Sequence, residues 1–331
     1  MNSLKTILLA SLPLLFDPSA GRTDATMPQP GRAESAERQH LSATSTVSDI
    51  LRHPAFFGHA RRVLPWDERG YDESMSLSRI SSLLPYHSAV DTRTVVGGLN
   101  RMIDDVADGR QVFYDIYSEQ EKLADPSKGN TGLFFFRGKP GAPFAIVSPG
   151  GGFAYLGSVH EGFPYAVEIN REGYNVFVLK YRVGQGARIA TEDLAAAISF
   201  VFESSRSLDV ATDGYSLWGS SAGARMAASI GSHGVATFGG DDLPKPAAVI
   251  MAYTAHSDHS DREPPTFAVV GSEDGIAPPA SMESRIEELR RIGTPVEYRR
   301  VPSVGHGFGT GAGTNAEGWI AEAVRFWERS R

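Results

Sequence analysis

Residues 215–230 read YSLWGSSAGARMAASI, and this stretch decides the fold. The apolar run Tyr215–Gly219 is typical of a buried strand, and Ser221–Ile230 has the small and apolar residues of a well-packed helix. The Gly-Ser-Ser-Ala-Gly turn between them puts Ser221 at a sharp strand-to-helix turn, where its hydroxyl would project from the end of the strand. The competing interpretation is an ordinary helix start, because serine is a favoured N-cap residue.

Strand and helix patterns alternate on both sides of this turn. Short apolar runs bounded by turn residues predict strands, and segments with helical spacing follow most of them. Because such apolar strands are buried on both faces, the pattern predicts an α/β fold with a mostly parallel central sheet and helices on both faces. The expected strands are Val112–Tyr117, Leu133–Arg137, Phe144–Ser148, Asn175–Lys180, Tyr215–Gly219, Ala248–Tyr253, Thr266–Val270 and Val296–Val301; the expected helices are His160–Arg171, Thr191–Ser204 with Thr191 as its cap, Ser221–Ile230, Ala280–Ile292 and Ala316–Arg331.

A serine hydroxyl becomes an effective nucleophile only when a base removes its proton, so Ser221 needs a histidine and an acid that orients it. His306 lies in a glycine-flanked loop after the last expected strand, and Asp274 follows the strand Thr266–Val270. All three residues would lie at carboxyl ends of strands, where open α/β sheets place their sites. Glu273 is the competing acid, but the shorter Asp274 would orient an imidazole with less freedom. We therefore expect Ser221, Asp274 and His306 to be the catalytic residues.

A glycine-rich loop, Ser-Pro-Gly-Gly-Gly-Phe at 148–153, follows another expected strand. Acyl transfer builds negative charge on a carbonyl oxygen, and glycines let backbone N–H groups approach that oxygen closely. Gly151 and Gly152, together with the N–H of Ala222, are therefore the expected oxyanion hole. The candidates for the walls of the substrate pocket are Phe153, Ser220 and His160, although for His160, as for its neighbour Glu161, electrostatics at a helix start is the favoured role.

These motifs together resemble an α/β-hydrolase of the carboxylesterase kind, near the hormone-sensitive-lipase-like and the acetyl or feruloyl esterase branches. The resemblance covers roughly Val112–Arg331 and is carried by PGGGF at 149–153, GSSAG at 219–223, the G-x-x-D turn that ends at Asp274, and GHGF at 305–308. Pro149 departs from the pattern, because lipase-like members usually have histidine there.

The resemblance implies a serine carboxylesterase that hydrolyses short-chain or sugar-linked acetyl or aryl esters through an acyl-enzyme. Its partner would be a small-molecule ester, and the reaction would need neither a metal nor an organic cofactor. Two alternatives remain at this point: a serine peptidase of the same fold, and a non-catalytic ligand-binding member.

The N-terminal third of the chain has a different character. Residues 1–21 have one lysine, an apolar run at 7–16 and then small residues, which predicts a secretory signal peptide and a secreted or periplasmic protein. Residues 22–48 are polar and predict a flexible tether. Residues 49–108 predict a helical extension that folds over the sheet as a cap, and 109–331 the catalytic domain. The apolar run is too short to span a membrane as a mature helix.

Composition excludes several classes of function. The 331 residues carry a net charge of −7, so nucleic acid is not expected as a partner. Cysteine is absent, which excludes thiolate metal sites, disulfides and cysteine nucleophiles. His256, Asp258, His259 and Asp261 could form a metal site by composition, but in a polar loop such residues are usually solvated, and Asp258 and Asp261 are also weak candidates for the acid. The sequence indicates no oligomeric state.

Overall fold

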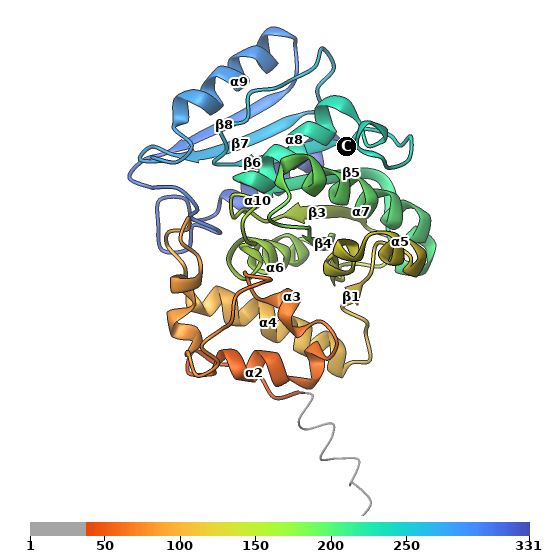
Figure 1. The fold of residues 1–331 in the computed structure, drawn as a ribbon. Coiled ribbons are helices and arrows are strands. Elements are labelled where there is room, and N and C mark those ends of the chain that lie inside the picture. The colour runs from red at the N-terminus through yellow and green to blue at the C-terminus, as the bar shows by residue number, and fades with distance from the viewer. Residues whose placement is uncertain (1–37) are drawn as a thin grey trace, which may run out of the picture.

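A computed structural model describes residues 38–331 and shows helices around one eight-stranded sheet (Figure 1). The strand order is β1-β2-β4-β3-β5-β6-β7-β8. The pairs β1–β2 and β2–β4 are antiparallel, and the pairings from β4 through β3 to β8 are parallel, so the predicted mostly parallel sheet is confirmed. The strands are β1 Phe113–Tyr114, β2 Gly132–Phe136, β3 Pro143–Ser148, β4 Asn175–Lys180, β5 Ala211–Ser220, β6 Ala248–Ala252, β7 Thr266–Gly271 and β8 Val296–Val301.

Helices cover both faces of this sheet (Figure 1). On one face α6 contacts β4 and α10, and on the other α8 contacts α7, β5 and β6. The strands β2, β4, β6 and β7 are buried along their whole length, which explains why they are apolar at almost every position. The longer helices are α4 Thr92–Ala107, α6 Phe163–Arg171, α7 Gly186–Leu208, α8 Ala222–His233, α9 Pro279–Arg291 and α10 Trp319–Ser330.

The starts of α8 and α9 lie within one residue of the prediction, and α6 begins at Phe163 after η4 rather than at His160, but α7 and α10 differ for reasons that the structure shows. α7 begins at Gly186, so Thr191 lies inside the helix, where its hydroxyl donates to the carbonyl oxygen of Ala187 at 2.8 Å. A threonine hydroxyl can form a hydrogen bond inside a helix as well as at a cap. Thr191 is therefore a misleading marker for the start of this helix. α10 begins at Trp319 and not at Ala316, because Gly318 has a φ of +85°, a conformation that a helix does not contain.

The N-terminal extension contains the helices α2 Val47–Arg52, α3 Ala60–Val63 and α4, and the residues just before it pack with it. Residues 1–21, the predicted signal peptide, lie outside the described residues, as do 22–37 of the predicted tether. Residues 38–48 are not a free tether: Leu41 is buried, and its backbone exchanges hydrogen bonds of 2.8 and 3.0 Å with the side chain of Asn100. The buried apolar side chains of Leu41 and Val47 explain why this polar-looking segment is held.

The extension forms an outer layer against α6 and also contacts the loop after β8. Gly98 of α4 lies so close to Phe163 of α6 that a Cβ at Gly98 would be 2.8 Å from the Cβ of Phe163. Just before α4, Ser88 donates its hydroxyl to the carbonyl oxygen of His306 at 2.7 Å. The described helices include none that is both long and apolar enough to cross a bilayer.

The remaining elements are short and lie between those already named. They are α5 Glu119–Ala124, the short 3-10 helices η1 Pro54–Phe56, η2 Leu77–Leu83, η3 Pro126–Asn130 and η5 Ala236–Phe238, and the π-helical turn η4 Ser158–Gly162.

Candidate active site

Ser221 lies at the turn from β5 to α8 in a strained backbone conformation. Its φ of +51° and ψ of −113° are sparsely populated by residues with a side chain. The small neighbours are required by close approach: a Cβ at Gly219 would collide with the backbone of Gly223, and a Cβ at Gly223 with the carbonyl oxygen of Ser148. The N–H of Ser221 donates to the carbonyl oxygen of Ala252 on β6 at 2.9 Å, which fixes the turn to the sheet.

His306 and Asp274 lie beside Ser221. Nδ1 of His306 is 2.7 Å from Oδ2 of Asp274, and Nε2 is 3.0 Å from Oγ of Ser221. The other carboxylate oxygen of Asp274 accepts two backbone N–H bonds, of 2.9 and 2.7 Å, from the turn that follows it. Glu273, the competing acid, is exposed, whereas Asp274 is 4% exposed. The arrangement can transfer a proton from the serine to the imidazole while a fixed carboxylate orients the ring.

The glycine loop after β3 lies next to Ser221. Gly151 and Gly152 have φ values of +130° and +63°, in the region that favours glycine. The N–H of Gly150 donates to Oε2 of Glu161. In the described part of the chain no hydrogen bond uses the N–H of Gly151 or Gly152. The N–H of Ala222, the first residue of α8, has no acceptor within its own helix.

Glu161 forms a buried network behind this loop that sequence reasoning did not find. Its side chain is fully buried and accepts hydrogen bonds from Gly150, from the hydroxyl of Tyr253 at 2.7 Å, and from Nε2 of His87 at 3.0 Å. Burial raises the pKa of Glu161, but the nearby His87 and the hydrogen bonds outweigh it and lower the pKa to about 2. Nδ1 of His87 contacts the hydroxyl of Tyr155 at 2.8 Å, so the extension contributes to the site.

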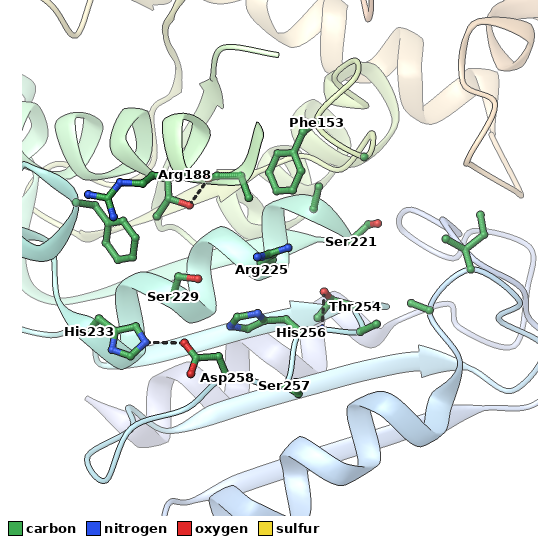
Figure 2. Close-up of a pocket in the computed structure, with 18 residues that line it drawn as sticks. Phe153, Arg188, Ser221, Arg225, Ser229, His233, Thr254, His256, Ser257 and Asp258 are labelled. Carbon is green, nitrogen blue, oxygen red and sulfur yellow. Dashed lines mark hydrogen bonds and ion pairs between the residues drawn. The ribbon is translucent and has the colours of Figure 1, made fainter. Parts of the chain in front are cut away.

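A cavity of about 660 Å³ opens beside Ser221 (Figure 2). Phe153 lies in its wall, as expected, and so do Gly152 and Ala222. The full lining is Gly152, Phe153, Ala187, Arg188, Thr191, Ser221, Ala222, Arg225, Ser229, His233, Phe238, Thr254, Ala255, His256, Ser257, Asp258, Ile276 and Ala277.

Ser220 and His160 do not line this cavity, contrary to the prediction. Side chains alternate along a strand, so Ser220 at the end of β5 points away from Ser221, and its hydroxyl donates to that of Tyr165 at 3.0 Å. His160 is 2% exposed and its Nε2 lies 3.0 Å from the carbonyl oxygen of Gly307. Burial and the nearby His87 lower the pKa of His160 to about 4.

The polar wall of the cavity comes from α8 and from the loop after β6. Nε2 of His233 is 2.6 Å from Oδ2 of Asp258 (Figure 2). Burial, together with the charges of Arg285 and Arg225, lowers the pKa of His256 to about 4, so this ring is neutral near pH 7. Of the four residues with a metal-site composition, His256 and Asp258 line the cavity, and His259 and Asp261 do not. The described residues contain no group of three or more side chains placed to hold a metal ion.

Comparison with known proteins gives likenesses in sequence and in structure. The model of the BD-FAE family matches residues 137–242. The acetylxylan esterase of Xylanibacter ruminicola is 23% identical over 238 residues, which are 63% of this chain and 49% of that protein. The chain thus spans about half the length of the curated relative that it matches.

Solved structures resemble between 60% and 66% of the chain. The acetyl ester-xyloside bifunctional hydrolase of Caldicellulosiruptor lactoaceticus has a TM-score of 0.57 at 21% identity, covering 66% of this chain and 95% of its own. Carboxyl esterase 2 of Tuber melanosporum has a TM-score of 0.54 at 18% identity, covering 61% and 82%. An α/β-hydrolase enzyme from a deep-sea metagenome library has 0.51 at 22%, covering 60% and 92%. The chain therefore has the α/β-hydrolase fold, as its motifs predicted.

Proposed function

We propose that the protein is a serine esterase that hydrolyses short-chain or sugar-linked esters, with acetyl and aryl esters as its substrates. The observation that carries the proposal is the continuous hydrogen-bonded series from Asp274 through His306 to Ser221, at the wall of an open cavity. A buried histidine that contacts both a fixed carboxylate and a strained serine is the arrangement that nucleophilic acyl transfer requires.

In this reaction Oγ of Ser221 attacks the ester carbonyl while Nε2 of His306 takes its proton. Asp274 orients the imidazole and stabilises its charged form. The N–H groups of Gly151, Gly152 and Ala222 receive the negative charge on the carbonyl oxygen. His306 then protonates the leaving alcohol, the C–O bond breaks, and an acyl-Ser221 remains. Water, deprotonated by the same imidazole, hydrolyses the acyl-enzyme, so no step needs a metal or an organic cofactor.

The cavity wall supports a short acyl group. Its large apolar side chains are Phe153, Phe238 and Ile276, and much of the rest is polar or small. A long alkyl chain would gain little there, since burial stabilises by about 25 cal/mol per Å² of apolar surface. The likeness to an acetylxylan esterase and to an acetyl ester-xyloside hydrolase also favours acetyl groups on sugars.

The decisive test compares the wild type with Ser221→Ala on 4-nitrophenyl acetate. We expect turnover by the wild type and a loss of about a thousand-fold or more in the variant. Covalent labelling by an organophosphonate, mapped to Ser221 by mass spectrometry, should accompany the activity. Full turnover by Ser221→Ala would contradict the proposal. Peptide anilides assayed beside esters test the peptidase alternative, and an acyl-length series on the wild type should favour short chains.

We further propose that the protein is secreted or periplasmic, on the strength of the signal-peptide pattern in residues 1–21. Expression of the full chain followed by N-terminal sequencing of the exported protein tests this. Cleavage near residue 21 is the expected result, and a protein that stays in the cytoplasm with its first residues intact would overturn it.

A further inference from the structure

Arg225 lies one helical turn after Ser221 on α8. Its backbone N–H donates to the carbonyl oxygen of Ser221 at 3.2 Å, and residues four apart lie on the same face of a helix. Both residues line the same cavity, and the Arg225 side chain is exposed to it (Figure 2). A full positive charge is therefore placed within one turn of the proposed nucleophile.

Arg225 has no counter-ion within residues 38–331, although neighbouring arginines do. Arg188, in the same cavity, pairs with Glu192 at 3.0 Å, and Arg285 pairs with Glu263 at 3.0 Å. Asp258, the carboxylate of the cavity wall, is 2.6 Å from His233. Arg225 is exposed in a concave wall, and the carboxylate of that wall already contacts a histidine. The guanidinium is therefore available to bind an anion.

The rest of the wall suits a small, polar, negatively charged ligand. His256 is neutral near pH 7, and its Nε2 is buried without a hydrogen-bond partner in the described part of the chain. The hydroxyls of Ser229, Thr254 and Ser257 add donors and acceptors to the same wall. The chain as a whole carries a net charge of −7, so a positive side chain without a counter-ion near Ser221 is opposite in sign to the charge of the molecule.

We propose that Arg225 is a specificity-determining residue and that the preferred substrate is an ester with a carboxylate close to its scissile bond. This inference rests on the proposed esterase function and names its substrate class. The fork of the guanidinium matches a carboxylate with two parallel N–H···O bonds, which a neutral ester cannot accept as well. The carboxylate lies either on the acyl group or on the alcohol, as in an acetylated hydroxy acid.

Two matched substrate pairs distinguish these sources. For the acyl side, mono-4-nitrophenyl adipate is compared with 4-nitrophenyl hexanoate, which has the same number of acyl carbons and no charge. For the alcohol side, 4-acetoxybenzoate is compared with its methyl ester. We expect the wild type to show a higher kcat/KM for the charged member of at least one pair by about ten-fold, and the preference should shrink as salt is added.

Variants assign the preference to Arg225. Arg225→Gln removes the charge and should lower the charged-to-neutral ratio of kcat/KM about ten-fold, whereas Arg225→Lys, which keeps the charge but not the fork, should give an intermediate ratio. Arg325→Gln is the matched control, because Arg325 is an exposed arginine on α10 that does not line the cavity. That variant should leave the ratio unchanged.

The outcomes separate the inference from the function on which it rests. If the wild type hydrolyses neutral esters and Ser221→Ala does not, the esterase proposal stands. If the charged-to-neutral ratio is then near one, or is the same in Arg225→Gln as in the wild type, the inference about Arg225 is overturned while the esterase function survives. A lower ratio in Arg225→Gln, with circular dichroism and melting temperature unchanged, supports it.

Discussion

The hydroxyl of Tyr253, the residue after β6, donates to Oε1 of Glu161 at 2.7 Å, and this bond ties the end of β6 to η4. Glu161 also accepts the N–H of Gly150, one residue before the first proposed oxyanion donor. The ring of Tyr253 in turn lies edge-on to His306, with centroids 5.1 Å apart. A single buried carboxylate thus connects the glycine loop to a residue that contacts the imidazole.

Replacing Glu161 by Gln should lower both activity and stability. Gly150, His87 and Tyr253 each direct one donor at Glu161. The amide oxygen of glutamine could accept from some of them, but its NH₂ group would face another donor. A buried unsatisfied group costs about 1–3 kcal/mol, so the urea midpoint should fall. Because the loop would lose its anchor, kcat for 4-nitrophenyl acetate should fall at least about ten-fold while KM changes little.

Glu172→Gln is the matched control, since Glu172 is exposed at the end of α6. Its stability and kinetics should equal those of the wild type. A Glu161→Gln enzyme with an unchanged kcat would show that this carboxylate does not position the loop.

The two adjacent acids at 273 and 274 give a second prediction. Asp274→Asn should lower kcat by about a thousand-fold or more, because an amide in place of the carboxylate favours the wrong tautomer of His306 and does not stabilise its charged form. Glu273→Gln should have no such effect, because Glu273 is exposed. Steady-state kinetics on both variants decide between the two acids, and an equal loss in both would contradict the assignment to Asp274.

Contacts that follow from the order of the strands could be predicted from the sequence, and contacts that depend on how a helix start packs behind the sheet could not. Ser221, Asp274 and His306 each follow a strand, so the parallel sheet alone brings them to one edge. Glu161 meets Tyr253 across 92 residues of sequence, and its local pattern indicates only a helix start.

Ser220 is a different kind of failure. Its neighbour Ser221 suggested a place in the pocket, but the alternation of side chains along β5 turns it to the opposite side, towards Tyr165. That signal was present in the sequence. The sequence carried no such signal for the ordered start of the extension. The polar segment around Leu41 is held by the side chain of Asn100, which lies on α4 far along the chain.

The glycines around Ser221 give a third prediction. Gly223→Ala should abolish soluble, active enzyme, because the added Cβ would collide with the carbonyl oxygen of Ser148, and backbone cannot yield as a flexible side chain does. Gly275→Ala, in the turn after Asp274, is the control: nothing lies within 4 Å of a Cβ built there and its φ is not positive. Circular dichroism and activity of Gly275→Ala should match the wild type. A folded and active Gly223→Ala protein would contradict the close approach.

The last prediction concerns acid stability. In the folded protein the pKa of His160 and that of His256 are lowered from 6.5 to about 4, chiefly by burial. Between about pH 4 and pH 6.5 the unfolded chain binds protons that the folded chain does not. The contribution of these histidines to the free energy of unfolding is therefore fully present above pH 6.5 and is lost as the pH falls towards 4. Protonation of Glu161, whose pKa of about 2 lies below its ordinary 4.5, removes further stability only below about pH 4.5.

Urea unfolding at about pH 7 and pH 5 measures the first of these effects. Each fully buried histidine of this kind contributes a loss of up to about 2 kcal/mol at pH 5, and partly exposed His256 contributes less because solvent screens it. His160→Gln removes one titrating group, so the difference between the two midpoints should shrink, even if the variant is less stable than the wild type at both pH values. An unchanged difference would mean that His160 does not resist protonation in the folded state. The same experiment on His256→Gln, at the cavity wall, should change the difference between the midpoints by less.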